Sequence, residues 1–160
     1  MEILFLGTAA ATATPLPFCR CPACQAGRRA GGKNLRKRSS VLIDGEILID
    51  LGPDFASACF EYGVSSAEIG CLLQTHSHSD HFDAGHLITR IPEYATENPR
   101  PMQIVASGAC LAHMSEKLAR EEEGATLLAA PWREKLGVEI VRAAHGNRLR
   151  YKNYEILCLE

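Results

Sequence analysis

One apolar segment that runs directly into a dense group of metal-binding residue types constrains this chain more than any other feature. Residues 69–74 read IGCLLQ, a nearly all-apolar run typical of a strand buried on both faces. The chain then continues without a break into THSHSDHFD, residues 75–83, which holds three histidines and two aspartates. The pattern therefore predicts a buried strand that delivers a short, ligand-rich segment.

The rest of the sequence alternates short strands with helices. Asp44-Gly45 predicts a hairpin within residues 41–50, and Gly52-Pro53 ends its second strand. We expect helices over residues 53–62, 83–90 and 108–123, and further strands over residues 1–6, 102–106, 126–129, 138–142 and 151–160. This alternation is typical of an α/β chain (α+β by some schemes), with a mixed sheet and helices on a face.

Composition places the chain among ordinary globular proteins. Its 160 residues are 46% hydrophobic and 22% charged, with a net charge of -2, which argues against a protein that coats nucleic acid generally but leaves local patches open. No apolar run approaches the roughly 20 residues of a membrane span. The N-terminal segment carries Glu2 and no early Lys or Arg, unlike a secretion signal. We therefore expect a cytoplasmic protein with no membrane partner.

The histidine-rich segment has the spacing of a two-metal site. Side chains two residues apart in extended backbone point the same way, so His76 and His78 can grip one ion together. Asp80 and His81 lie where the chain turns and can face a second ion about 3.5–4 Å away. Imidazole and carboxylate suit zinc, iron or manganese. A polar loop with incidental histidines is the less favoured alternative, because four ligand-type residues occupy six positions after a buried strand.

The seven cysteines fall into two groups. Cys19, Cys21 and Cys24 form a C-x-C-x-x-C cluster whose thiolates can wrap one soft ion, with a fourth ligand from elsewhere in the chain. We expect structural zinc there; three free surface thiols are the alternative, which is harder to explain because such thiols oxidise readily. The other cysteines lie singly in apolar stretches and are predicted to be small buried hydrophobes: Cys59, Cys71, Cys110 and Cys158.

The segment THSHSDH after an apolar strand resembles the signature motif of the metallo-β-lactamase superfamily. LGTAAA near the N-terminus and ILIDLG in the predicted hairpin resemble the opening strands of the same superfamily. The resemblance implies an αβ/βα sandwich, present here in part, with two divalent ions at one edge. It assigns His76 and His78 to the first ion and His81 to the second. It also implies that Asp80 binds the second ion and steers a bridging hydroxide, and that Asp50 orients the site through hydrogen bonds.

The cysteine cluster lies in a loop insertion over residues 18–40, which resembles the insertion of the PhnP-like phosphodiesterases. Those enzymes carry a structural zinc besides the catalytic metal pair. The resemblance implies hydrolysis of cyclic or nucleotide-type phosphodiesters through a metal-activated hydroxide, so we expect a small phosphoester as substrate. A nucleic-acid partner remains possible but is not favoured. The basic run Arg36-Lys37-Arg38 can bind a substrate phosphate or be a solvated loop.

Other functions remain open at this point. A lactonase, a thioesterase or a tRNA-processing nuclease uses the same scaffold, and a non-catalytic, zinc-stabilised module is the alternative outside enzymes. The superfamily's third histidine, bridging aspartate and last histidine are missing from the sequence. We therefore expect a single domain, residues 1–160, that is the N-terminal part of a hydrolase of roughly 250 residues. A complete but degenerate chain is the alternative.

The remaining histidines are not expected to join the ligand set. His145 is predicted in a hairpin turn, and His86 and His113 in packing or surface positions. A half-domain would expose a sheet edge, so we also expect the chain to form a homo-oligomer.

Overall fold

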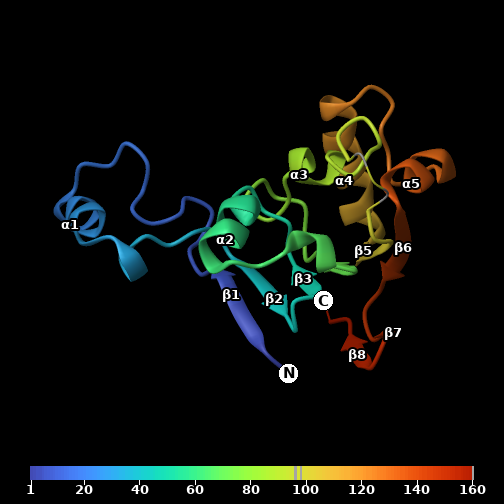
Figure 1. Ribbon diagram of the computed structural model, residues 1–160, viewed down its shortest axis with the longest axis horizontal. Helices are drawn as coiled ribbons and strands as arrows, with labels where there is room; N and C mark the ends of the chain where they lie inside the picture. Colours follow the sequence, from blue (N-terminus) through green and yellow to red (C-terminus); the bar gives the residue numbers. More distant parts are fainter. Residues whose placement is uncertain (96, 98, 160) are drawn as a thin grey trace.

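The computed structural model describes residues 1–95, 97 and 99–159 (Figure 1). Within these residues, a six-stranded sheet runs in the order β1-β2-β3-β4-β5-β6, and β7 pairs with β8 in a separate hairpin. The strands are β1 (Ile3–Gly7), β2 (Ser40–Ile43), β3 (Ile47–Ile49), β4 (Cys71–Leu73), β5 (Met102–Ser107), β6 (Val138–Ala143), β7 (Arg148–Tyr151) and β8 (Tyr154–Leu157). The α-helices are α1 (Pro22–Ala30), α2 (Phe55–Tyr62), α3 (Ala84–Ile88), α4 (Gly108–Glu121) and α5 (Ala130–Leu136).

The sheet is mixed, as the alternating sequence pattern predicts. β1, β2 and β3 are antiparallel, whereas β3, β4, β5 and β6 run parallel to one another. Parallel neighbours need a crossover connection: α2 lies between β3 and β4, α3 lies between β4 and β5, and α4 and α5 both lie between β5 and β6. The predicted α/β class is therefore confirmed.

The two faces of the sheet bury different layers, because side chains alternate along each strand. In β4, Leu72 points into the larger core, which also contains apolar residues of α2, α3, α4 and α5. The preceding residue, Cys71, points to the opposite face and packs with Val105. Leu149 and Tyr154 of the β7–β8 hairpin pack against this second cluster. Helices thus cover one face of the sheet and the hairpin covers part of the other.

The predicted turn and helix signals in the first third of the chain are confirmed. Asp44 and Gly45 join β2 to β3 with positive φ angles of 47° and 72°, the left-handed conformation that a tight hairpin turn needs. Helix α2 ends at Gly63, whose φ of 65° is left-handed and lets its N–H bond back to Cys59.

The prediction for residues 126–129 is wrong. They form no strand but an irregular segment that leads into α5, a helix that the sequence pattern did not predict. Leu127 is buried, and its N–H donates to the Ser115 hydroxyl of α4 at 3.0 Å, so this backbone needs no sheet partner. Pro131 suits the first turn of α5, and Gly137 ends the helix in a left-handed conformation.

The prediction of one continuous last strand over residues 151–160 is also wrong. The strand is split at Lys152, which has a φ of 49°, into the two strands of the β7–β8 hairpin. Glu160, to which that prediction extended, lies outside the described residues.

The cysteine-containing insertion is not simply a loop. It contains α1 and a 3₁₀ turn at Gly32–Asn34, and none of the residues from 15 to 38 is buried. Figure 1 shows α1 standing apart from the sheet and from the other helices. We call residues 15–38 the cysteine arm. None of the helices in the described part of the chain has both the length and the apolar character needed to cross a membrane.

Gly7 provides a test of how the base of the cysteine arm is packed. A Cβ atom at this position would lie 1.8 Å from the carbonyl oxygen of Arg38. We expect Gly7→Ala to lower the free energy of unfolding by about 1–3 kcal/mol, measured by urea denaturation, because the crossing backbone must move.

Gly108→Ala is the matched control, because a Cβ there meets nothing within 4 Å. It should change the free energy of unfolding by less than about 0.5 kcal/mol. Equal effects of the two substitutions would contradict the close approach at Gly7.

Candidate metal centre

The histidine-rich segment folds back over the end of β3 through a tight turn. The N–H groups of His81 and Phe82 both donate to the carbonyl of His78, at 3.0 and 2.8 Å. Gly52 makes the close approach possible, since a Cβ at this position would lie 2.5 Å from the carbonyl oxygen of Asp80. The turn therefore brings Asp80 and His81 back toward the histidines that precede them.

The four predicted ligand residues gather in one place. The ring centroid of His76 lies 4.8 Å from that of His78 and 4.0 Å from that of His81. Nε2 of His81 lies 3.2 Å from a carboxylate oxygen of Asp80. Two ligand atoms that each bind a tetrahedral ion at about 2.0–2.2 Å are separated by about 3.3–3.6 Å, close to the observed spacing, so Asp80 and His81 can share one ion.

Asp50 is a carboxylate buried beneath this cluster. Its residue is 4% exposed and its backbone is left-handed, with a φ of 64°. Nδ1 of His81 donates to one carboxylate oxygen at 2.6 Å. The other oxygen accepts from Gln74 Nε2 at 3.0 Å and from the Thr75 N–H at 2.8 Å, and the Thr75 hydroxyl donates at 2.9 Å. Protein donors therefore surround both oxygens.

These bonds assign which nitrogen of each imidazole is available. His81 donates from Nδ1 to Asp50, so its Nε2 carries the lone pair and faces Asp80. The single hydroxyl proton of Thr75 goes to Asp50, so the same oxygen accepts from Nδ1 of His76 at 2.9 Å. His76 thus also keeps its lone pair on Nε2. A carboxylate or hydroxyl that fixes the ring of a ligating histidine in this way is a usual outer partner in a metal site.

Gln74 and Thr75 join the site, although no role was predicted for either residue. The buried amide of Gln74 accepts from the Leu51 N–H at 3.3 Å and donates toward the carbonyls of His76 and His81 at 2.7 and 3.0 Å. It thereby links the end of β3 to both limbs of the histidine-rich turn. The available signal was a polar side chain at the end of an otherwise apolar strand.

One close group of ligand atoms in the described part of the chain differs from the predicted pairs. Atoms of Asp50, His76 and His81 lie within 4.8 Å of one another, whereas His78 is exposed at the rim. Because Asp50 already accepts from several protein donors, its geometry suits orienting His81 rather than binding an ion. Imidazole nitrogens and the Asp80 carboxylate form a donor set that fits zinc, iron or manganese. The assignment of each side chain to an ion stays a prediction.

The cysteine cluster is brought together on the arm. The sulfur atoms of Cys19, Cys21 and Cys24 lie within 4.8 Å of one another, and in the described part of the chain no other ligand type joins them. Cys21 caps α1, and the Cys24 N–H that donates to its sulfur at 3.4 Å lowers the pKa of the Cys21 thiol to about 7. A thiolate is the form that binds metal, so the cluster suits a soft ion such as zinc.

Solved structures similar to this chain identify its fold. A diphosphatase of the PhnP family is 21% identical, with a TM-score of 0.62, and the match covers 97% of this chain and 54% of that one. Zn²⁺-bound PqqB from Methylobacterium extorquens is 23% identical, with a TM-score of 0.67, over 93% of this chain and 48% of the other. Human tRNase Z, short form, is 23% identical, with a TM-score of 0.50, over 77% and 39%.

The chain has the metallo-β-lactamase fold. No protein-family model matches the chain, and neither does any curated protein. It spans about half the length of the PhnP-family and PqqB chains. The predicted fold, present in part, is thus confirmed; at these identities the similarity establishes the fold and not the activity.

Within the metallo-β-lactamase fold, the single cysteines are mostly core residues, as predicted. Cys59, Cys71 and Cys110 are buried, whereas Cys158 is only half-buried, so the prediction is wrong for that residue. Burial raises the pKa of the Cys71 thiol to about 12 and that of Cys110 to about 11. These two side chains therefore stay protonated and act as small hydrophobes.

The other histidines lie outside the cluster. His86 places Nε2 3.2 Å from the Pro53 carbonyl, and His145 lies in the turn between β6 and β7, as predicted. His113 is exposed on α4, with Nδ1 3.3 Å from the Ser77 hydroxyl. That contact with the histidine-rich segment was not predicted.

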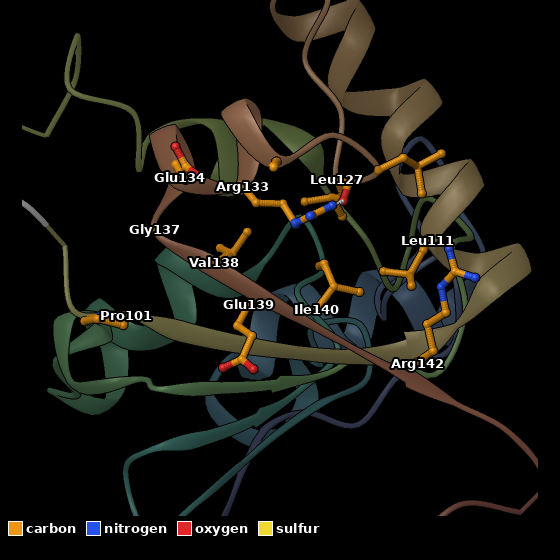
Figure 2. A pocket seen from close by; sticks show the side chains of 12 residues that line it. Pro101, Leu111, Leu127, Arg133, Glu134, Gly137, Val138, Glu139, Ile140 and Arg142 are labelled. Carbon is orange, nitrogen blue, oxygen red and sulfur yellow. Dashed lines mark hydrogen bonds between the residues drawn. The ribbon is translucent and has the colours of Figure 1, made fainter.

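Two hollows flank the sheet. A groove of about 630 Å³ follows β6 beneath α4 and α5, and Figure 2 shows Leu111, Arg133 and Ile140 around it. It contains none of the clustered histidines. A pocket of about 390 Å³ opens at the carboxyl ends of β4, β5 and β6, beside β8, and Thr75 lies in its wall. The second pocket is the one that adjoins the metal-binding cluster.

Removing the acceptor behind His81 tests the role of Asp50. We expect Asp50→Asn to weaken binding of Mn²⁺ by about 10–100-fold, because the amide cannot accept from His81, Gln74 and Thr75 together. Mn²⁺ prefers nitrogen and oxygen to thiolate ligands, so titration calorimetry with it reports the histidine cluster and not the cysteines.

Asp83→Asn is the control for that variant. The Asp83 carboxylate caps α3 by accepting from the Gly85 N–H at 2.8 Å, and asparagine caps helices equally well. Unchanged Mn²⁺ affinity in Asp50→Asn would show that Asp50 does not orient the site.

The cysteine cluster predicts one tightly held zinc ion. We expect Cys21→Ser to reduce the zinc that survives dialysis by about one ion per chain, measured by atomic absorption, because a hydroxyl is a poor zinc ligand. Cys158→Ser should leave the zinc content unchanged. Equal zinc content in all three proteins would rule out a site on the arm.

Proposed function

We propose that this chain belongs to a metal-dependent hydrolase that cleaves phosphodiesters of the cyclic or nucleotide type. The observation that carries the proposal is the gathering of His76, His78, Asp80 and His81 above a buried, fully hydrogen-bonded Asp50. Structural needs alone do not explain three imidazoles packed against one another at the carboxyl edge of a parallel sheet, where ligands usually bind.

Each side chain has a separate task in this proposal. His76 and His78 would hold one divalent ion, and Asp80 and His81 a second, with zinc, manganese or iron as candidates. Bound ions would polarise the phosphoryl oxygens and make water nucleophilic near neutral pH. The similar PqqB structure is Zn²⁺-bound, which supports a divalent ion in this fold.

The protein groups supply orientation and a proton acceptor. Asp50 holds His81 in the tautomer that keeps Nε2 available, and Thr75 does the same for His76. Among the described residues, no backbone N–H donates to the Asp80 carboxylate, unlike that of Asp50, and one of its oxygens faces Nε2 of His81. It can accept a hydrogen bond from the attacking water and so align it with phosphorus.

The pocket beside Thr75 supplies room for the organic part of the ester. Its walls include Val105, Ile156 and Leu157, which are apolar, and the hydroxyl-bearing Ser107. Two of the similar structures are named as a diphosphatase and a tRNase, and both names denote chemistry at phosphorus. These features favour a phosphodiester over a lactone or a thioester.

The full ligand set would extend beyond these residues. Within the described part of the chain, the cysteine cluster is the one further group of ligand-type side chains gathered closely enough to hold an ion. We therefore propose that a third histidine, a bridging aspartate and a last histidine are supplied from outside these 160 residues, by further chain or by a second copy.

Metal-dependent turnover tests the proposal. The Mn²⁺- or Zn²⁺-loaded protein that carries the whole ligand set should hydrolyse bis-p-nitrophenyl phosphate, and His76→Ala should lower kcat/KM by at least about 100-fold, because one ion loses a ligand. His145→Ala, in the β6–β7 turn, should leave kcat/KM unchanged. The same comparison is made with a panel of diesters that includes 2′,3′-cyclic nucleotides. The proposal fails if the parent and His76→Ala turn over every diester in the panel at the same rate. Faster cleavage of a lactone or a thioester would assign a different hydrolase.

A further inference from the structure

The positive charge of this protein is concentrated in the cysteine arm. Residues 15–38 hold seven of the seventeen Lys and Arg residues and none of the nineteen Asp and Glu residues. The rest of the chain therefore sets ten cations against nineteen anions. The overall net charge of -2 is thus the sum of a strongly basic arm and an acidic remainder of the chain. Such an uneven charge distribution is typical of an element that binds polyanions.

Most of the arm's cations are not neutralised by the protein. Arg38 pairs with Asp54 at 3.0 Å and Lys37 pairs with Glu61, so these two are compensated. Arg28, by contrast, donates to the backbone carbonyls of Cys19 and Leu16, which are uncharged.

Arg36 likewise bonds only neutral atoms, the hydroxyl and carbonyl of Thr8. Three further side chains make no hydrogen bond or ion pair with any described residue: Arg20, Arg29 and Lys33. All five uncompensated side chains are exposed. Three thiolates around one divalent ion would add a single negative charge, so the arm stays clearly positive with a metal bound.

These cations lie close together along the chain. Arg20 precedes α1, Arg29 lies in its last turn, and Lys33 lies in the 3₁₀ turn that follows. A nine-residue helix is about 14 Å long, so the three side chains span a few successive phosphates of a nucleic-acid strand.

Phe18 adds an exposed aromatic ring to the same arm. Its side chain is 100% exposed, and its backbone has a φ of 63°, a conformation that bulky residues rarely adopt. That conformation belongs to the turn over residues 16–19, in which the Cys19 N–H donates to the Leu16 carbonyl at 3.2 Å, and the ring is left in solvent. An aromatic face held in solvent among phosphate-binding cations is the arrangement on which unpaired bases stack.

We infer that the cysteine arm is a docking surface for single-stranded nucleic acid. Arg20, Arg29 and Lys33 contact backbone phosphates, and Phe18 stacks on a base. Figure 1 shows the arm standing clear of the sheet. A single strand of nucleic acid can therefore pass along the arm without displacing other elements. This binding does not depend on the proposed hydrolysis, since none of these residues belongs to the histidine cluster.

Salt-dependent binding of a labelled RNA tests the inference. The probe is a fluorescein-labelled 12-residue oligouridylate, and its affinity for the full chain is measured by anisotropy between 50 and 200 mM salt. The triple variant Arg20→Gln/Arg29→Gln/Lys33→Gln should weaken binding at least tenfold at 100 mM salt. It should also reduce the slope of log K against log salt by about 2, since each single-strand phosphate contact contributes about 0.7.

Three exposed arginines of the acidic body provide the matched control, because none of them has a partner among the described residues: Arg120, Arg142 and Arg150. Changing all three to Gln removes the same charge and should leave the slope unchanged. If both triple variants lose the same affinity and slope, or if the parent chain does not bind the oligonucleotide, the inference is wrong.

Phe18→Ala separates stacking from general electrostatics. It should weaken oligouridylate binding about tenfold without changing the salt slope, because stacking releases no counterion. Phe60→Ala is the control, since Phe60 is 85% exposed on α2, outside the arm. Equal effects of the two would refute a stacking role. Binding to anionic phosphatidylserine vesicles but not to the RNA would assign the arm to a membrane surface and overturn the inference.

Discussion

The buried carboxylate of Asp50 is the feature on which the candidate metal centre depends. A charged group withdrawn from water must be matched by hydrogen bonds, or burying it costs several kcal/mol. Here the donors come from Gln74, Thr75 and His81, which lie on both sides of the histidine-rich turn. Asp50 reaches them because it follows β3 in a left-handed conformation, beside the end of β4. The register of two core strands and the shape of the ligand-rich turn are therefore coupled.

That coupling explains how a surface segment can hold defined side-chain directions. Loops are usually mobile, and a metal site needs ligands held to within a fraction of an ångström. Gln74 fixes the backbone of the segment at the carbonyls of His76 and His81, and Asp50 and Thr75 fix the two imidazole rings. The directions of Nε2 thus come from bonds among protein groups. The histidine cluster lies at the surface, but hydrogen bonds to buried residues hold it in place.

Local pattern predicted the turn at Asp44-Gly45, the buried strand and the closeness of the clustered histidines, since each depends on neighbours in sequence. It could not predict the role of Gln74, which requires knowing that β3 and β4 pair in parallel with Ile49 beside Leu73. The helix α1 was missed for another reason: it buries no residue, so no packed apolar face distinguishes it from the surrounding loop. Before α5, the short apolar run over residues 126–129 resembled a strand, although its Leu127 is buried against α4.

The side chains of the cysteine arm are not constrained by packing in the core. Its base is fixed, because Thr8 and Ala9 donate to the carbonyl of Lys37 and Thr14 pairs with Arg36. Beyond that base none of its residues is buried, so the core places no requirement on the side chains there. A segment under no packing constraint would be expected to mix charges as other surfaces do. Packing therefore does not account for the absence of acidic residues from the arm or for its exposed aromatic ring, and the docking surface inferred above would account for both.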